Sequence, residues 1–276
     1  MKKSTLLLFI VFAVIGCTKD EAPINIPKLK NCRVEYLFFR DEITLSGNQS
    51  MNFLPNDSSF VTCSYTYTDD KLTKNTGGFV NVPAGINFSN LLFSTAVYDS
   101  IDFEGNRIYI FTKAKFATTI VENTYDPVIF TLNADKKLST IFKRDAYNPD
   151  GYSYTYTHSD NLITETNSKG QVSRKFFFEN NNLVKVVSEI FDLNGTLCSK
   201  KEILFQEFDN KPNPFKNMYF VKGAFFRAFS ENNYQKFTIN EYSQLNDGTF
   251  GLYNTGWFSM PIEYNADDYP MFGDYQ

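Results

Sequence analysis

Aromatic or apolar residues alternate with threonine and serine along most of this chain, and each alternating run ends in a small polar turn. The clearest runs are Tyr65–Leu72, Tyr152–Leu162 and Phe176–Leu183. Side chains on a strand point alternately to its two faces, so each run predicts a strand with one aromatic and one hydroxyl face. Asparagine, aspartate and glycine accept the positive φ that tight hairpin turns require. The repeated pattern therefore predicts a series of β-hairpins.

The second run shows the alternation most clearly, because Tyr152, Tyr154 and Tyr156 would share one face of a strand. Asn194-Gly195 is the strongest single turn signal. Further turns are expected at Glu104-Gly105-Asn106, Asn133-Ala134-Asp135, Asp209-Asn210, Asn232-Asn233, Asn246-Asp247-Gly248 and Asn265-Ala266-Asp267.

The spacing of successive runs drifts, which argues against a strict solenoid. We therefore expect an all-β domain over residues 31–276, an antiparallel meander of hairpins that forms a large curved sheet or an open barrel or sandwich. Asn87–Val97 is a candidate for one short helix, and Thr73–Val97 is expected to form a long loop or to contain that helix. A turn near residues 146–151 leaves two lobes possible, although one sheet is favoured.

Composition supports the same fold class. The 276 residues include 29 Phe and 17 Tyr but one Trp, and aromatic residues fit strands better than helices. The formal net charge is −4, and no basic block interrupts the sequence. These charges favour neither nucleic acid nor anionic lipid headgroups as partners.

The N-terminal residues have the layout of a secretory signal. Lys2 and Lys3 precede an apolar run from Leu6 to Ile15, and Gly16 follows it. The apolar run is too short to span a bilayer, which takes about 20 residues. Residues 1–16 are therefore predicted to be a signal peptide.

The end of this signal, Val14-Ile15-Gly16-Cys17, resembles a bacterial lipobox. The resemblance implies that Cys17 is lipidated and becomes the mature N-terminus, which anchors the protein in a membrane through its acyl chains. Residues 17–30 would form a proline-containing tether. Its Lys19-Asp20-Glu21 segment is similar to the surface-export signal of Bacteroidota lipoproteins, which implies an outer-membrane protein displayed at the cell surface.

The three remaining cysteines do not have the spacing of a zinc site. Cys32 and Cys63 each lie in an early strand-like run, so a disulfide between them is possible if the two strands are neighbours. The alternative is that both are unpaired small apolar residues.

Few residues are suited to catalysis. His158 is the sole histidine, which removes most triads and most metal sites, and we expect it at a solvated hairpin tip. The carboxylate pairs Asp69-Asp70, Asp267-Asp268 and Asp99 with Asp102 would suit glycoside hydrolysis only if two of them faced one cleft. Turn formation explains the adjacent pairs more simply. We therefore expect no enzyme, no cofactor and no metal.

Two resemblances to known families add to this interpretation. Tyr65–Leu72 and Tyr152–Leu162 look like YD repeats of the Rhs type, although the consensus glycine is mostly absent. Glu207–Phe215, Glu231–Tyr234 and Ile262–Pro270 are similar to segments of uncharacterised Bacteroidota surface lipoproteins. The second resemblance implies a hairpin array behind a lipid anchor, without enzymatic activity.

These inferences lead to one functional hypothesis and two alternatives. The chain is expected to be a lipid-anchored envelope protein that binds a glycan or an envelope partner, with Trp257, Tyr253 and Tyr264 as a possible ligand surface. Trp257 is expected in a loop, because Gly251 and Gly256 lie close to it. The alternatives are a YD-like structural or secretion-associated shell and an envelope hydrolase that uses paired carboxylates.

Overall fold

The computed structural model describes residues 28–33, 49–52, 62–83, 89–116, 119–122, 127–144, 148–192 and 195–273. The predicted signal peptide, Cys17 and the tether before Lys28 lie outside these residues, as does Asn194. No helix within the described ranges has the length and apolar character needed to cross a bilayer.

Sixteen strands and one 3₁₀ helix make up the described structure. The strands of the first half are β1 (Asn31–Arg33), β2 (Gln49–Asn52), β3 (Thr62–Thr68), β4 (Lys71–Pro83), β5 (Ser89–Glu104), β6 (Arg107–Phe116), β7 (Thr119–Glu122), β8 (Val128–Leu132) and β9 (Leu138–Lys143). The second half contains β10 (Tyr152–Ser159), β11 (Leu162–Asn167), β12 (Val172–Glu179), β13 (Asn182–Phe191), β14 (Leu197–Pro212), η2 (Arg227–Phe229), β15 (Asn232–Gln244) and β16 (Phe250–Ser259).

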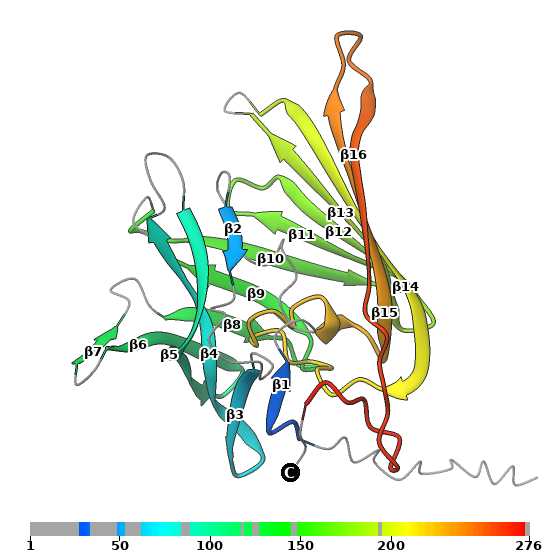
Figure 1. Cartoon of the computed structure of the whole chain (residues 1–276). Coiled ribbons are helices and arrows are strands. Elements are labelled where there is room, and N and C mark those ends of the chain that lie inside the picture. Colours follow the sequence, from blue (N-terminus) through cyan, green and yellow to red (C-terminus); the bar gives the residue numbers. More distant parts are fainter. Residues whose placement is uncertain are drawn as a thin grey trace, which may run out of the picture.

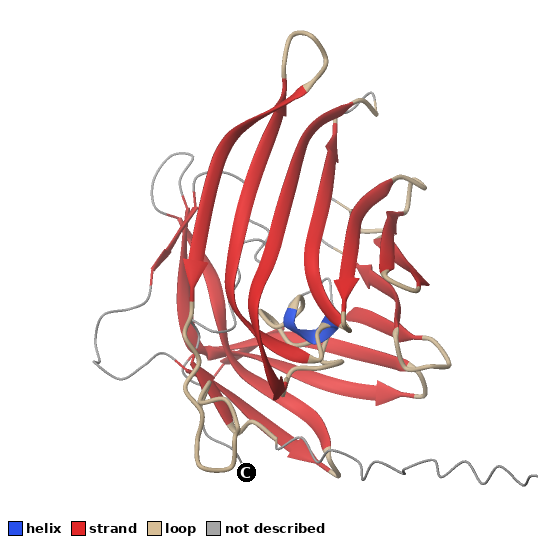
Figure 2. Cartoon of the chain, turned by 90° about the vertical axis from the view of Figure 1, so that its right-hand side faces the viewer, coloured by secondary structure: helices blue, strands red, loops and turns tan. Residues whose placement is uncertain are grey.

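All sixteen strands belong to one sheet with the order β1-β3-β4-β5-β6-β8-β9-β10-β11-β12-β13-β14-β15-β16, while β2 pairs with β5 and β7 pairs with β6. Every pairing except β2 with β5 is antiparallel. The sheet curves around η2 without closing, and the β15–β16 hairpin extends beyond its neighbours (Figures 1 and 2). The predicted all-β meander is confirmed, and the sheet runs without a break from β9 to β10.

The hairpins form because the turn residues adopt the backbone angles that their side chains permit. Asp69 and Asp70 have φ values of 48° and 66°, and Asn180 and Asn181 have values of 48° and 62°. Two consecutive positive φ angles are typical of the type I′ turn, whose twist matches that of the flanking strands. The aspartate and asparagine residues in these positions therefore allow the tight turns that reverse the chain.

The alternation along β10 sorts its side chains as predicted. Tyr156 is buried, whereas Thr155 and Thr157 on either side of it are exposed. Tyr154 packs against the same core as Tyr156. The aromatic face of this strand is therefore its core face, in agreement with the pattern of the sequence.

The predicted helix at Asn87–Val97 and the predicted loop at Thr73–Val97 are wrong, because β4 and β5 form a long hairpin there. Gly77 and Gly78, a pair typical of loops, instead mark a bulge, where the register of β4 with β5 shifts between Thr76 and Gly78. Gly77 has a φ of 108°, and a Cβ there would lie 2.8 Å from the ring of Phe93. Glycine thus allows two strands to approach closely.

The predicted turns at Asp209-Asn210 and Asn232-Asn233 are also wrong. Asp209 lies within β14, and Asn232 begins β15. The chain does reverse between these two strands, but it does so through residues 213–231, here called the central segment. This segment leaves the sheet and returns before β15.

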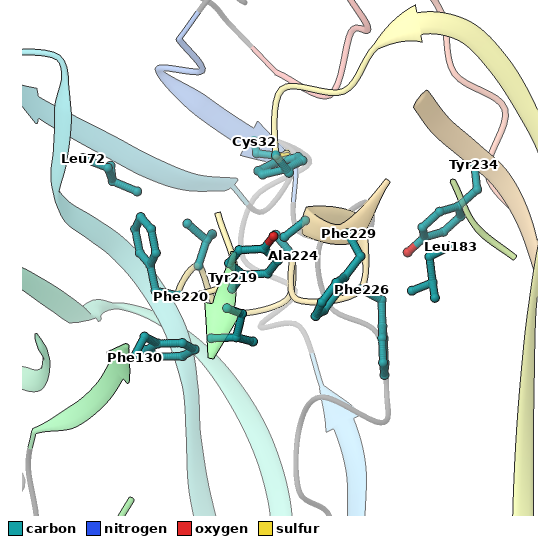
Figure 3. Packing of buried hydrophobic residues seen from close by; sticks show 14 of the residues in the cluster. Cys32, Leu72, Phe130, Leu183, Tyr219, Phe220, Ala224, Phe226, Phe229 and Tyr234 are labelled. Carbon is teal, nitrogen blue, oxygen red and sulfur yellow. The ribbon is translucent and has the colours of Figure 1, made fainter. Parts of the chain in front are cut away.

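The central segment fills the concave side of the sheet. Figure 3 shows its side chains lying between Leu72 and Phe130 on one wall and Leu183 and Tyr234 on the other. Its buried apolar residues are Phe215, Tyr219, Phe220, Val221, Ala224, Phe226, Ala228 and Phe229. A sheet this curved needs such a filling, because its inner apolar face would otherwise contact water.

Polar groups, of which Asn213 is buried, hold the two ends of the central segment together. Asn213 Nδ2 donates hydrogen bonds to the carbonyl oxygens of Arg227 at 2.6 Å and Ser230 at 3.0 Å, and its Oδ1 accepts one from the Phe215 amide. Asp209 accepts hydrogen bonds from the Lys211 and Asn233 amides. The Asp209–Phe215 motif therefore has a structural role.

One edge of the sheet is covered by the C-terminal residues. The Arg33 amide on β1 donates a 2.7 Å hydrogen bond to the Phe272 carbonyl, and Phe272 itself is fully buried. Leu29 is also buried, so the last residues of the predicted tether belong to the core.

Candidate functional site

The three aromatic residues predicted as a ligand surface do not converge. Trp257 and Tyr253 are 69% and 63% exposed, but both lie on strand β16, so Trp257 is not in a loop as predicted. Tyr264 is partly buried against the core and donates a hydrogen bond to Asp209 Oδ2. Burial, followed by this bond, raises the pKa of Tyr264. Tyr264 therefore has a structural role away from the other two.

His158 is not at a solvated hairpin tip, as predicted, but in β10, where it is partly buried. Its Nε2 lies 2.6 Å from the Leu138 carbonyl oxygen and donates a hydrogen bond to it. The ring thus joins β10 to the start of β9.

The carboxylate pairs lie in different settings. Asp99 is buried on β5, whereas Asp102, three residues further along the same strand, is exposed and faces the opposite side. Asp69 and Asp70 form the β3–β4 turn. Asp268 forms an ion pair of 2.7 Å with Lys211, and Asp247 accepts hydrogen bonds from Thr249 within its own turn. Within the described ranges, no three His, Cys, Asp or Glu side chains gather as metal ligands would.

Cys32 and Cys63 lie directly opposite each other in the β1–β3 pairing. The Tyr65 amide bonds to the Lys30 carbonyl, so by alternation Cys32 and Cys63 also form a hydrogen-bonded pair, with Cα atoms about 5.5 Å apart. That spacing suits a disulfide. The bridge remains a prediction, because both residues are present as thiols in the structure.

We expect the native protein to react with iodoacetamide at Cys198 but not at Cys63. Cys198 is exposed, whereas burial, with a further contribution from the charge of Asp99, raises the pKa of the Cys63 thiol to about 12. The thiolate is the form that attacks iodoacetamide and displaces its iodide, so Cys63 stays unmodified until the protein unfolds. Peptide mapping by mass spectrometry, with and without denaturant and reductant, checks this expectation and also reveals a Cys32–Cys63 bridge. Modification of Cys63 in the native state would contradict it.

The structure contains a cleft of about 630 Å³ at one end of strands β10 to β14, where the ends of these five neighbouring strands lie side by side. We call it the rim cleft. Its walls come from the start of β10, the β11–β12 turn, and the connection between β13 and β14. Its volume lies within the range of about 300–1,000 Å³ that is typical of small-molecule sites.

Aromatic rings and polar groups, some of them charged, line the rim cleft. Tyr152 and Tyr154 pack edge to face, with ring centroids 5.7 Å apart. The polar part of the lining includes the side chains of Asn148, Ser153, Ser168, Lys169, Gln171 and Glu189. A cleft with this lining can place hydroxyl-rich ligands against a ring while amides and hydroxyls bind their oxygen atoms.

The β11–β12 turn is held in one shape by its own hydrogen bonds. Asn167 Oδ1 accepts bonds of 3.0 Å from the amides of both Lys169 and Gln171, and Asn167 Nδ2 donates to Gln171 Oε1. Gly170 adopts the positive φ of 77° that the turn needs. The polar groups of this wall are therefore pre-organised, which reduces the entropy that a ligand would have to remove.

A buried charged network lies beside the cleft. Glu165 is 1% exposed and accepts hydrogen bonds from Tyr156 Oη at 2.6 Å, Ser173 Oγ at 2.6 Å and Arg174 Nε at 2.8 Å. Burial raises the pKa of Glu165, but Arg174 and the hydrogen bonds outweigh it, so that the pKa is lowered overall. Ser173 belongs to both the cleft and this network.

Sequence reasoning did not find the rim cleft. It placed Tyr152 and Tyr154 on one face of a strand without assigning them to a site, and it assigned no role to the Asn167–Gln171 turn. The alternating pattern places these residues on strands and turns. Only the order of the strands in the meander brings the connections before β10, between β11 and β12, and between β13 and β14 to the same end of the sheet.

Comparisons with known proteins provide no identity for the chain. No family model matches it, and no curated protein matches it. Among solved structures, it is similar to a porin-like protein from Bacteroides uniformis, with 10% identity, a TM-score of 0.39, and coverage of 74% of this chain and 92% of that chain. It is also similar to a porin-like protein from Bacteroides vulgatus, with 13% identity, a TM-score of 0.43, and coverage of 77% and 85%. Sequence identities and TM-scores this low support no conclusion about function.

Proposed function

We propose that this chain is a lipid-anchored protein of the cell envelope that binds a saccharide in the rim cleft. The lipobox-like segment ending in Cys17 supports the anchor and the outer-membrane location. The observation that carries the binding proposal is the combination of the Tyr152–Tyr154 ring pair with a pre-organised polar turn in one cleft. The role is binding rather than catalysis.

The two alternative functions, a structural or secretion-associated shell and an envelope hydrolase, receive less support. An enclosing shell needs a hollow interior, whereas the central segment occupies the concave side of this sheet. A hydrolase needs two carboxyl groups about 5–10 Å apart that face one ligand. Asp99 and Asp102 face opposite sides of β5, and Glu165 is engaged by five hydrogen bonds from Arg174, Ser173 and Tyr156.

Replacing Tyr152 with alanine is expected to weaken saccharide binding about tenfold, which corresponds to about 1.4 kcal/mol. The variant removes one ring of the cleft wall, and Tyr152 is not among the residues that form the core. The probe is an array of bacterial envelope polysaccharides and their oligosaccharide fragments. The protein is the full chain with Cys17→Ala, which leaves the lipid out of the measurement.

Tyr109→Ala is the matched control. Tyr109 is a partly exposed tyrosine on β6, outside the rim cleft, and the variant should bind like the parent. Circular dichroism shows that both variants keep their strands. The proposal fails if no saccharide on the array binds, or if Tyr152→Ala and Tyr109→Ala bind equally well.

A further inference from the structure

Strand β16 forms the second edge of the sheet, and within the described residues it pairs with β15 alone. The Met260 amide donates to the Gln235 carbonyl, so alternate residues of the strand direct their backbone groups toward β15. By this alternation the N–H and C=O groups of Thr255, Trp257 and Ser259 point away from β15. They present an open ladder of donors and acceptors.

The two edges of the sheet differ in their protection. Proteins usually protect an edge strand with charges, with proline or with a covering segment. The C-terminal residues cover β1 through the Arg33–Phe272 hydrogen bond. Phe250–Ser259 contains neither a charged residue nor a proline, although the chain as a whole has a net charge of −4.

The apolar side chains of β16 are also exposed. Leu252, Tyr253, Trp257 and Phe258 are 55%, 63%, 69% and 50% exposed. The register of β15 with β16 shifts at Tyr253, because Glu241 lies opposite Asn254 while Tyr242 lies opposite Leu252. Tyr253 is the extra residue of this bulge, and the alternation of side chains is interrupted there. Trp257 and Phe258 are consecutive, so their rings point to opposite faces. The strand is therefore an uncharged edge with exposed rings on both faces.

We propose that β16 is a homodimer interface, at which the free edge of one copy pairs in antiparallel fashion with the same edge of a second copy. A two-fold axis at Thr255 places the two Thr255 residues opposite each other and each Trp257 near the bulge at Tyr253 of the other copy. Aromatic pairs of this kind stabilise neighbouring strands, and an interface with two-fold symmetry must be self-complementary in this way. An uncharged strand meets its own copy without repulsion. The interface lies apart from the rim cleft and does not depend on its ligand.

The exposed area is consistent with this assignment. A buried aromatic side chain covers about 150–250 Å², so the four side chains, each half or more exposed, contribute on the order of 400 Å² per copy. A stable interface needs about 800 Å² per copy. The remainder has to come from the backbone ladder and the β15–β16 turn, so the pairing must extend along the whole strand.

Light scattering on the full chain with Cys17→Ala should show a dimer. Thr255→Lys puts two ammonium groups opposite each other at the two-fold axis and should raise the dimer dissociation constant at least about tenfold. Asn240→Lys is the matched control, because Asn240 lies opposite Thr255 on β15 and thus one strand away from the edge. This variant should remain a dimer.

A cysteine pair tests the register separately. In a Cys198→Ser background, Thr255→Cys should form a covalent dimer on mild oxidation, whereas Ser259→Cys, which lies on the same edge but away from the axis, should not. A parent protein that stays monomeric at high concentration overturns the proposal, as does a dimer that persists in Thr255→Lys. Equal crosslinking of the two cysteine variants overturns the axis at Thr255.

Discussion

Replacing Phe176 with alanine is expected to lower the free energy of unfolding by about 3–5 kcal/mol. Phe176 on β12 is fully buried and contacts the rings of Tyr156, Phe225, Phe226 and Phe229. Its loss opens a cavity where the sheet meets the central segment. Rigid strands on one side allow little collapse into that cavity, so the cost should lie in the upper part of the range.

Phe177→Ala provides the comparison for this experiment. The two residues are adjacent and undergo the same chemical change, but Phe177 faces the outer side of the sheet, where it is partly exposed beneath Lys185. We expect a loss of about 1 kcal/mol there. Urea unfolding of the two variants measures both values, and equal losses would show that the core does not lie on the inner face.

Replacing Arg174 with methionine is expected to destabilise the protein by about 3 kcal/mol at pH 7. Methionine keeps an apolar stem against Phe176 and Phe225, but it removes the positive charge that faces Glu165. The carboxylate is 1% exposed and would be left without its cation. An uncompensated buried charge costs far more than an exposed ion pair contributes.

The pH dependence distinguishes a lost charge from lost packing. In the parent, the pKa of Glu165 is lowered on folding, so its stabilising effect is present above the unfolded-state pKa and disappears as the pH falls through the folded-state value. In Arg174→Met, burial is expected to raise this pKa instead, so that protonation relieves the penalty at low pH. The difference between the two proteins should therefore shrink from pH 7 to pH 4.

Lys175→Met is the control for this second experiment. Lys175 is the neighbour of Arg174 on β12 and pairs with Glu189 at 3.2 Å, but its side chain is 38% exposed. We expect a loss below about 1 kcal/mol without the same change with pH. A loss in Arg174→Met that is equally large at pH 7 and pH 4 would mean that packing, and not charge, explains the effect.

The hairpins could be predicted because their signals are local. Alternation separates Tyr156 from Thr155 and Thr157, and Asp69-Asp70 or Asn180-Asn181 can form their turns without help from distant residues. The same local rules misjudged Gly77. A glycine pair is common in loops, and only the nearby ring of Phe93 shows that a bulge needs it.

The central segment and the rim cleft depend on distant contacts. Asp209 and Asn232 are of types common in turns, but the Asp209 side chain accepts a hydrogen bond from the Asn233 amide on β15, and the Asn232 side chain accepts one from Asn182 on β13. The buried positions of the segment follow no strand or helix period. The rim cleft likewise needs connections that lie more than 40 residues apart, from Asn148 to Gly195. Such sites become visible only when the strand order is known.

The central segment also affects how the chain can fold. Lys222 pairs with Asp99 across 123 residues of sequence, at 2.6 Å, so β5 acquires this partner only after most of the polypeptide has been synthesised. Until then the central segment does not cover the inner faces of the earlier strands, and folding that depends on such remote contacts is slow and prone to aggregation. Chaperones bound to the growing chain until its synthesis is complete would protect it during that interval.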